Sequence, residues 1–276
     1  GWRDRAGRVR ARARAAMRSA APQVQVAGTS EFLSIVDRQT TGGHVWEAAR
    51  ALLHYIEQTK ALHGCTSLLE LGAGTGWLGM SLALQLRQQL ERVALTEMEE
   101  GNACEWLRHN VELNRQRLAA VPTDGAHGEA SNDGLEVMGN VEVAPLDWCC
   151  VEADERPALM DCRWDAIIGS DLIYNEAGAT MLPRVMRVLI DAACRTTGAR
   201  DLPPSPPCVL YAHTRYRFEH LDRDFFEECA KTGLVLSRVW PAEDERPPSP
   251  PPFTELFPDQ YVAIYKVTLR CTLDDM

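Results

Sequence analysis

The chain has 276 residues, 45% of them hydrophobic and 25% charged, with a formal net charge of −10 at pH 7. The apolar content can fill a sizeable core, yet no run approaches the ~18–20 apolar residues of a membrane-spanning helix. The negative charge argues against general binding to nucleic acid phosphates, which needs a basic surface. We therefore expect neither a membrane nor a nucleic acid partner.

The nine cysteines form no C-x-x-C pair, and the seven histidines show no spacing typical of metal ligands. We predict no metal site and a reduced compartment, with the cytoplasm favoured and the nucleus as an alternative.

Residues 1–18 carry seven arginines and a single acidic residue. Such a leader resembles a mitochondrial transit sequence. We favour a basic tail without fixed structure over residues 1–30, followed by one domain over residues 31–276.

Ordered structure is expected from Thr41. Val45, Ala48, Leu52 and Ile56 recur at helical spacing, which predicts an amphipathic helix over residues 43–59. Strands and helices then alternate. The predicted strands cover residues 66–71, 92–97, 141–145, 166–170 and 208–213, and the predicted helices cover residues 77–90, 101–118, 178–194 and 217–232.

The C-terminal part breaks this alternation. Val235–Trp240 and Gln260–Thr268 are apolar strands separated by a Pro-rich stretch with no helix, so they are expected to pair antiparallel. The whole pattern predicts an α/β fold, with a doubly wound, mainly parallel seven-stranded sheet that ends in an antiparallel pair. Surface insertions are expected near residues 119–138, 198–207 and 243–258.

A glycine-rich turn follows the first predicted strand. Gly72, Gly74 and Gly76 alternate there before an apolar helix, so a ligand can approach the backbone beside free helix N–H groups. The dinucleotide fingerprint would need a third small residue where Trp77 stands. With Glu70, the pattern reads E-x-G-x-G-x-G and resembles motif I of the class I S-adenosylmethionine-dependent methyltransferases. The resemblance implies a Rossmann-like methyltransferase fold, with Glu70 near the methionine end of the cofactor.

Two further segments fit an adenosine-containing cofactor. Glu97 ends the second strand, 21 residues after Gly76, where a carboxylate can accept hydrogen bonds from both ribose hydroxyls. Asp147 and Trp148 follow the third strand and offer an acceptor and an aromatic face for adenine. A surface turn beside a core tryptophan explains Asp147 and Trp148 equally well.

The fourth strand continues as D-A-I-I-G-S-D-L-I-Y and ends in polar groups at Ser170, Asp171 and Tyr174. This run is similar to the D-x-x-[YF] motif of the family-16-type protein lysine methyltransferases, and V-W-E-A-A around Trp46 resembles their segment before motif I. The resemblance implies that Trp46 and Ser170 lie at the cofactor. It also implies a protein substrate, such as a chaperone, a translation factor or an ATPase, and we expect a monomer.

The implied reaction moves the sulfonium methyl group to a lysine amine. Deprotonating lysine at pH 7 costs about 4–5 kcal/mol, and an apolar channel lowers that cost. Asp171 would orient the amine and Tyr174 would form a channel wall. Asp171 as a helix cap and Tyr174 as packing is the structural alternative. The functional alternatives are methylation of a small-molecule amine or of another protein nucleophile such as histidine, and a scaffold that binds cofactor without catalysis.

Overall fold

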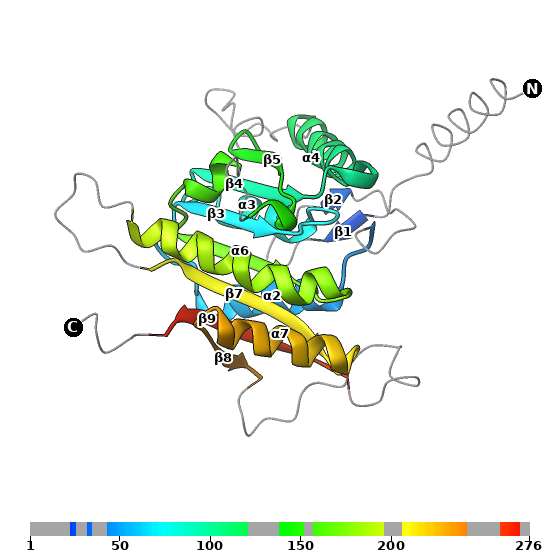
Figure 1. The fold of residues 1–276 in the computed structure, drawn as a ribbon. Coiled ribbons are helices and arrows are strands. Elements are labelled where there is room, and N and C mark those ends of the chain that lie inside the picture. The colour runs from blue at the N-terminus through cyan, green and yellow to red at the C-terminus, as the bar shows by residue number, and fades with distance from the viewer. Residues whose placement is uncertain are drawn as a thin grey trace, which may run out of the picture.

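A seven-stranded sheet with helices on both faces forms the body of the protein (Figure 1). The structure is a computed structural model that describes residues 23–25, 32–34, 43–120, 138–151, 157–195, 206–241 and 260–270. In this sheet the strand order is β5-β4-β3-β6-β7-β9-β8. Its strands are β3 Ser67–Leu71, β4 Arg92–Glu97, β5 Val141–Pro145, β6 Ala166–Ser170, β7 Cys208–Arg215, β8 Leu234–Trp240 and β9 Tyr261–Leu269.

The direction of the strands confirms the predicted fold class. Strands β5, β4, β3, β6 and β7 pair in parallel, whereas β9 lies antiparallel between β7 and β8. Parallel neighbours need a crossover connection, and helices supply it here. The carboxyl ends of all five parallel strands therefore meet at one edge of the sheet.

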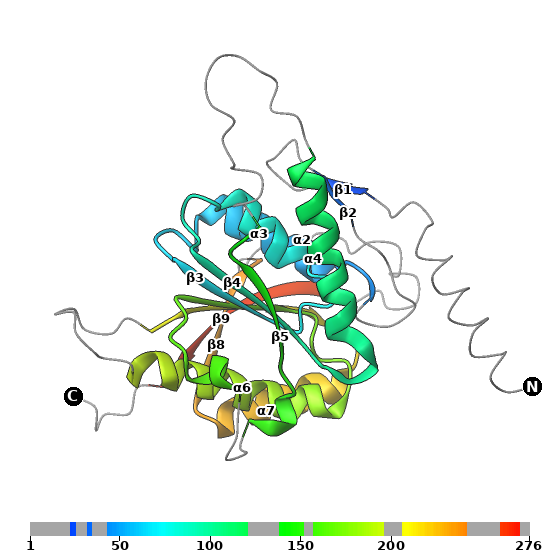
Figure 2. The same ribbon diagram turned by 90° about the horizontal axis from the view of Figure 1, so that it is seen from above.

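Helices cover the two faces in separate groups (Figure 2). One face carries α2 Glu47–Thr59, α3 Trp77–Gln85 and α4 Ala103–Ala119, and the other carries α6 Glu176–Arg195 and α7 Glu219–Lys231. Because neighbouring strand residues point to opposite faces, Leu68 packs into the first core and Leu69 into the second. Short 3-10 helices η2 Glu100–Asn102, η3 Trp148–Cys150 and η4 Ala158–Asp161 follow strands or connect them.

Two helices differ from their predicted bounds by four residues or more, and the other three by no more than two at either end. The helix predicted over residues 77–90 ends at Gln85, because Leu86 leaves helical geometry at φ −107° and ψ 24°. Beyond it, the Gln89 side chain donates to the carbonyl oxygens of Leu62 and Cys65 at 2.6 and 2.8 Å. The helix predicted from residue 43 begins at Glu47, since Trp46 is extended at φ −76° and ψ 154°.

Two short strands near the N-terminus were not predicted. β1 Gln23–Gln25 and β2 Phe32–Ser34 pair antiparallel, and Leu33 of β2 is buried against the core that holds α2, α3 and α4. β1 falls within the segment predicted as a basic tail. The rest of that segment, and most of the three predicted insertions, lie outside the described residues.

A carboxylate joins two strands at the edge opposite the carboxyl ends. Asp165 stands just before β6, and its Oδ2 accepts the N–H and hydroxyl of Thr66 and the N–H of Ser67 at 2.8–3.1 Å. Burial alone would raise the pKa of Asp165, but these donated hydrogen bonds lower it below its ordinary value. The amino ends of β3 and β6 are thus held together.

Gly76 and Gly64 offer a matched test of how tightly the glycine turn is packed. Both have left-handed φ angles, +79° and +83°, and a Cβ on Gly76 would lie 2.5 Å from Leu107 Cδ1, whereas a Cβ on Gly64 would meet open space. In both alanine variants, the left-handed backbone angle lowers the unfolding free energy by roughly 1–2 kcal/mol, because alanine has a Cβ. We expect Gly76→Ala to lose about 1–3 kcal/mol more unfolding free energy, from overpacking. Urea denaturation measures both variants, and equal losses would contradict the packing described.

Candidate active site

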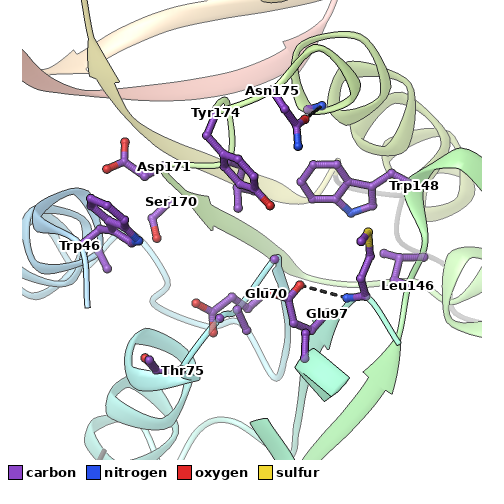
Figure 3. Close-up of a pocket in the computed structure, with 18 of the residues that line it drawn as sticks. Trp46, Glu70, Thr75, Glu97, Leu146, Trp148, Ser170, Asp171, Tyr174 and Asn175 are labelled. Carbon is purple, nitrogen blue, oxygen red and sulfur yellow. Dashed lines mark hydrogen bonds between the residues drawn. The ribbon is translucent and has the colours of Figure 1, made fainter. Parts of the chain in front are cut away.

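A cavity of about 400 Å³ opens at the carboxyl ends of the parallel strands (Figure 3). This volume lies in the range of roughly 300–1,000 Å³ that is typical of small-molecule sites. Ten of the eleven predicted site residues line the cavity: Trp46, Glu70, Gly72, Gly74, Glu97, Asp147, Trp148, Ser170, Asp171 and Tyr174. The fold thus brings together residues from Trp46, just before α2, to Tyr174, in the turn after β6.

Gly76 is the exception and does not line the cavity. A Cβ added to Gly76 would point into the core, toward Leu107 and Leu95. Gly76 is also the N-cap residue of α3. Its predicted contact with cofactor stays a prediction. Gly72 behaves differently, because a Cβ there would lie 2.5 Å from Leu172 Cδ2 and 3.5 Å from Trp148 Cζ2, both of which line the cavity.

Two glutamates at the ends of neighbouring strands face the cavity. Glu70 of β3 is buried and accepts the N–H of Gly79 in α3 at 2.9 Å. Burial raises the pKa of Glu70 to about 8, the Gly79 N–H opposes that rise, and nearby Glu97 adds to it. Burial also raises the pKa of Glu97, whose carboxylate accepts the N–H of Met98 at 3.0 Å. The pair offers acceptors for hydroxyl groups or for a cation.

Asp147 and Trp148 form the wall that follows β5. Asp147 accepts the N–H of Cys149 at 2.9 Å and so caps the 3-10 helix η3, which matches the turn weighed from sequence. Trp148 is half-buried and lies beside Gly72. An aromatic face therefore stands next to a backbone with no side chain, while the contact of Asp147 with a ligand stays a prediction.

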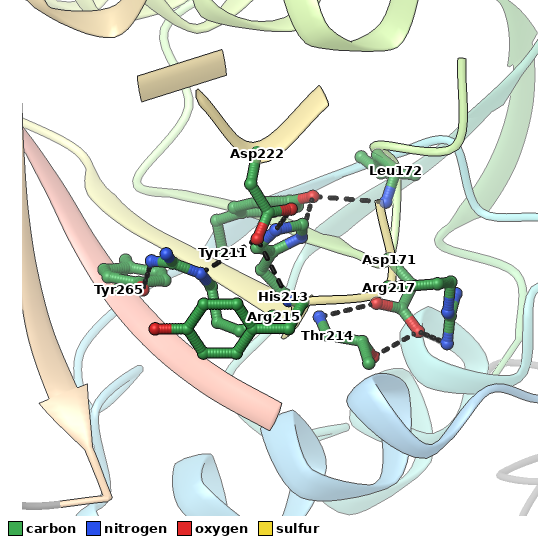
Figure 4. Close-up of polar contacts among 10 residues, drawn as sticks. Asp171, Leu172, Tyr211, His213, Thr214, Arg215, Arg217, Asp222 and Tyr265 are labelled. Carbon is green, nitrogen blue, oxygen red and sulfur yellow. Dashed lines mark hydrogen bonds and ion pairs between the residues drawn. The ribbon is translucent and has the colours of Figure 1, made fainter. Parts of the chain in front are cut away.

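Asp171 lies in the turn after β6, where its carboxylate contacts the end of β7 and Arg217 (Figure 4). Asp171 has φ +53°, a left-handed angle that is costly outside glycine. Its carboxylate, with a side-chain exposure of only 2%, accepts the N–H and hydroxyl of Thr214 at 2.8 and 2.9 Å and pairs with Arg217 at 3.2 Å. Asp171 thus fastens its own turn to the end of β7.

Aromatic side chains surround the opening. Tyr174 is 46% exposed at the mouth, and Phe218 is 37% exposed. The guanidinium of Arg217 lies over the ring of Trp46, 4.8 Å from its centroid. All four residues line the cavity. An apolar, aromatic opening with one carboxylate behind it suits the aliphatic stem and amine of a lysine side chain.

Sequence reasoning missed Arg217 and Thr214, because each meets Asp171 across more than 40 residues. It also assigned Trp77 no role beyond excluding the dinucleotide fingerprint. Trp77 is buried, lines the cavity, and its Nε1 has no hydrogen-bond partner among the described residues. A buried donor of this kind is available to a ligand acceptor.

Neither a metal centre nor a membrane helix emerges from the part of the chain that the structure describes. Its His, Cys, Asp and Glu side chains form no group of three or more that could hold a metal ion. None of its helices combines the length and apolarity needed to cross a bilayer.

Comparison with known proteins agrees with this geometry. A model of a family described as lysine methyltransferase matches residues 31–229, most of the chain. The chain belongs to this family. The matched region contains every residue of the candidate site named above.

Individual relatives are similar to the chain over much of its length. Protein-lysine N-methyltransferase EEF2KMT of Mus musculus is 28% identical over 245 residues, which cover 88% of this chain and 62% of that protein. Protein N-terminal and lysine N-methyltransferase EFM7 of Cryptococcus neoformans is 25% identical over 203 residues, or 70% and 59% of the two chains. The chain thus spans about six tenths of the length of these relatives. A methyltransferase structure from Pyrococcus furiosus covers 84% of this chain and 88% of its own at 16% identity, with a TM-score of 0.41.

Glu70 gives a pH-dependent prediction. Its folded pKa of about 8 lies above the ordinary value of 4.5, so the folded protein keeps a proton that the unfolded chain releases between these values. The stability from that proton is complete below about pH 4.5 and is lost as the pH rises through 8. Glu70→Gln keeps the acceptor for Gly79 but cannot titrate. We expect its unfolding free energy to fall less than that of the wild type from about pH 6 to about pH 9.

Urea denaturation across this pH range tests the expectation. Glu105→Gln, an exposed substitution on α4, serves as the matched control and should follow the wild type. Parallel curves for all three proteins would show that Glu70 does not hold the proton.

Proposed function

We propose that the protein transfers a methyl group from S-adenosylmethionine to a lysine amine of a protein substrate. One observation carries the proposal: the glycine turn, the two glutamates and the turn bearing Asp171 and Tyr174 all face one cavity. Family membership supports the same activity, as do the names of the relatives.

The residues of the cavity fit this cofactor chemically. Glu97 would accept from the ribose hydroxyls, and Glu70 would face the ammonium of the methionine part. Trp148 would pack on adenine, with Asp147 as an acceptor for its amine. Gly72 leaves a space that a Cβ would fill, and the unpartnered Nε1 of Trp77 could donate to an acceptor of the ligand.

When bound, S-adenosylmethionine supplies a methyl group already activated by its sulfonium. The protein therefore mainly brings the amine into line and excludes water. Tyr174, Trp46 and Phe218 would surround the lysine stem and favour the neutral amine, because burial disfavours charge on an amine. Both oxygens of Asp171 already accept hydrogen bonds, so we assign to it orientation of the amine and of the turn rather than removal of a proton.

Asp171→Ala tests this assignment. We expect the variant to lose methyl transfer by about a hundredfold or more, as misplaced reacting groups do, while the cofactor Kd stays within several-fold. Calorimetry measures the affinity, and transfer of labelled methyl measures the rate. Asp224→Ala, at a half-buried position of α7 that does not line the cavity, should leave both unchanged. Normal turnover in Asp171→Ala would refute the role given to Asp171.

Gly74→Arg tests the location of the cofactor. Gly74 has φ +55° and lines the cavity, so an arginine there should fill the pocket and abolish cofactor binding. Gly64→Arg introduces the same side chain at another left-handed glycine, away from the cavity, and should bind normally. Cofactor binding by Gly74→Arg with unchanged affinity would place the site elsewhere.

Incubation of the wild-type protein with labelled cofactor and a cell lysate tests the function as a whole. We expect label on a protein, on a lysine mapped by mass spectrometry, and none with Gly74→Arg. Label on a histidine or on a small molecule would favour the corresponding alternative, and binding without transfer would favour a scaffold.

The substrate class and cellular location are also proposals. Resemblance supports a chaperone, a translation factor or an ATPase as the substrate. Cysteine usage supports a cytoplasmic location, with the nucleus as an alternative. We propose a monomer that binds no nucleic acid and no membrane.

A further inference from the structure

A buried chain of hydrogen bonds runs from the Asp171 turn to helix α7 (Figure 4). The N–H of Leu172 donates to the Tyr211 hydroxyl at 3.2 Å. That oxygen lies 3.4 Å from His213 Nδ1, and His213 Nε2 lies 2.8 Å from Asp222 Oδ1. All four residues are buried. The methyl transfer proposed above requires none of the three side chains.

The protonation state of Asp222 decides which group donates in its contact with His213. Burial would raise the pKa of Asp222, but donors from His213, Tyr216 and Arg215 hold it below its ordinary value, so the carboxylate only accepts. His213 Nε2 must then carry a proton. The Tyr211 oxygen accepts from Leu172 and also contacts His213 Nδ1. The two ring nitrogens of His213 therefore link Tyr211 to Asp222.

The same aspartate supports a second turn of the cavity. Asp222 Oδ2 accepts Arg215 Nε and the N–H of Tyr216, each at 3.1 Å, and Tyr216 has a left-handed φ of +62°. Tyr216 directly precedes Arg217 and Phe218, which line the cavity. The Arg217–Asp171 ion pair then connects the two turns. Two strained turns of the cavity are thus tied to one carboxylate.

We propose that Tyr211, His213 and Asp222 form a positioning unit that fixes the Asp171–Tyr174 turn against the cavity for methyl transfer. Tyr211 is its decisive member, because its hydroxyl is the contact with the turn. The unit acts through Leu172 and touches neither the substrate nor the cofactor. This inference rests on the proposed function only for its effect on rate, since the effect on the turn is measurable without activity.

Tyr211→Phe and Tyr265→Phe form a matched pair. Each removes one buried hydroxyl of the same network, but the Tyr265 hydroxyl accepts from Arg215 Nη1 at 2.9 Å and leads away from Leu172. In Tyr211→Phe we expect the kcat of methyl transfer to fall at least about tenfold, since small displacements of a reacting group are costly. The KM for protein substrate and the cofactor Kd should stay within about threefold. Tyr265→Phe should keep all three values.

Amide hydrogen exchange provides the readout that does not need activity. We expect exchange at Leu172 to quicken by about tenfold in Tyr211→Phe, because its N–H loses its acceptor, and to stay unchanged in Tyr265→Phe. Asp222→Asn should quicken exchange at both Leu172 and Tyr216. If Leu172 exchanges alike in both tyrosine variants, the positioning unit is refuted whatever the activity. If exchange changes but kcat does not, its effect on the reaction is refuted. A wild type without transfer refutes the proposed function alone.

Discussion

The two hydrogen bonds between the Asp171 carboxylate and Thr214 hold the cavity in shape. The ladder between β6 and β7 ends at Ser170 and Ala212, after which β6 leads into the turn before α6 while β7 continues to Arg215 beside β9. One backbone bond follows, from the N–H of Asp171 to the carbonyl oxygen of Ala212 at 2.9 Å, and side chains make the remaining contacts, since loops beyond a ladder have few backbone bonds. The Asp171 side chain continues the contact between the two strands beyond the ladder by accepting from Thr214. In that position its backbone adopts a strained left-handed angle. Both Tyr174 and Arg217 depend on the resulting geometry.

Electrostatics explain why a cavity with several carboxylates is tolerable in a folded protein. Asp171 at the cavity and Asp222 behind it are buried but surrounded by donors, which is the condition for burying charge. Glu70 has one donor among the described residues, Gly79, and burial raises its pKa to about 8, which favours the protonated form at neutral pH. A cationic ligand would supply the missing charge and favour release of that proton. The site thus keeps acceptors ready without confining several unpaired negative charges in a small volume.

Local patterns predicted much of this molecule, and contacts distant in sequence account for what they missed. Alternating apolar runs identified the strands, and Glu70 and Glu97 were found because polar residues ended two such runs. Spacing does not reveal which way a turn glycine faces, and a side chain added to Gly76 would meet Leu107. The partners of Asp171 and the chain from Leu172 to Asp222 join residues that no local pattern connects.

Asp165 holds β3 and β6 together at the edge opposite the cavity, and it contributes nothing to the cavity lining. The same two strands therefore carry a stabilising contact at one end and candidate reactive groups at the other. Mutations of Asp165 should accordingly reduce the amount of folded protein and leave the chemistry of the cavity unchanged. Such a separation lets residues around the cavity diverge during evolution while the strands that present them keep their register.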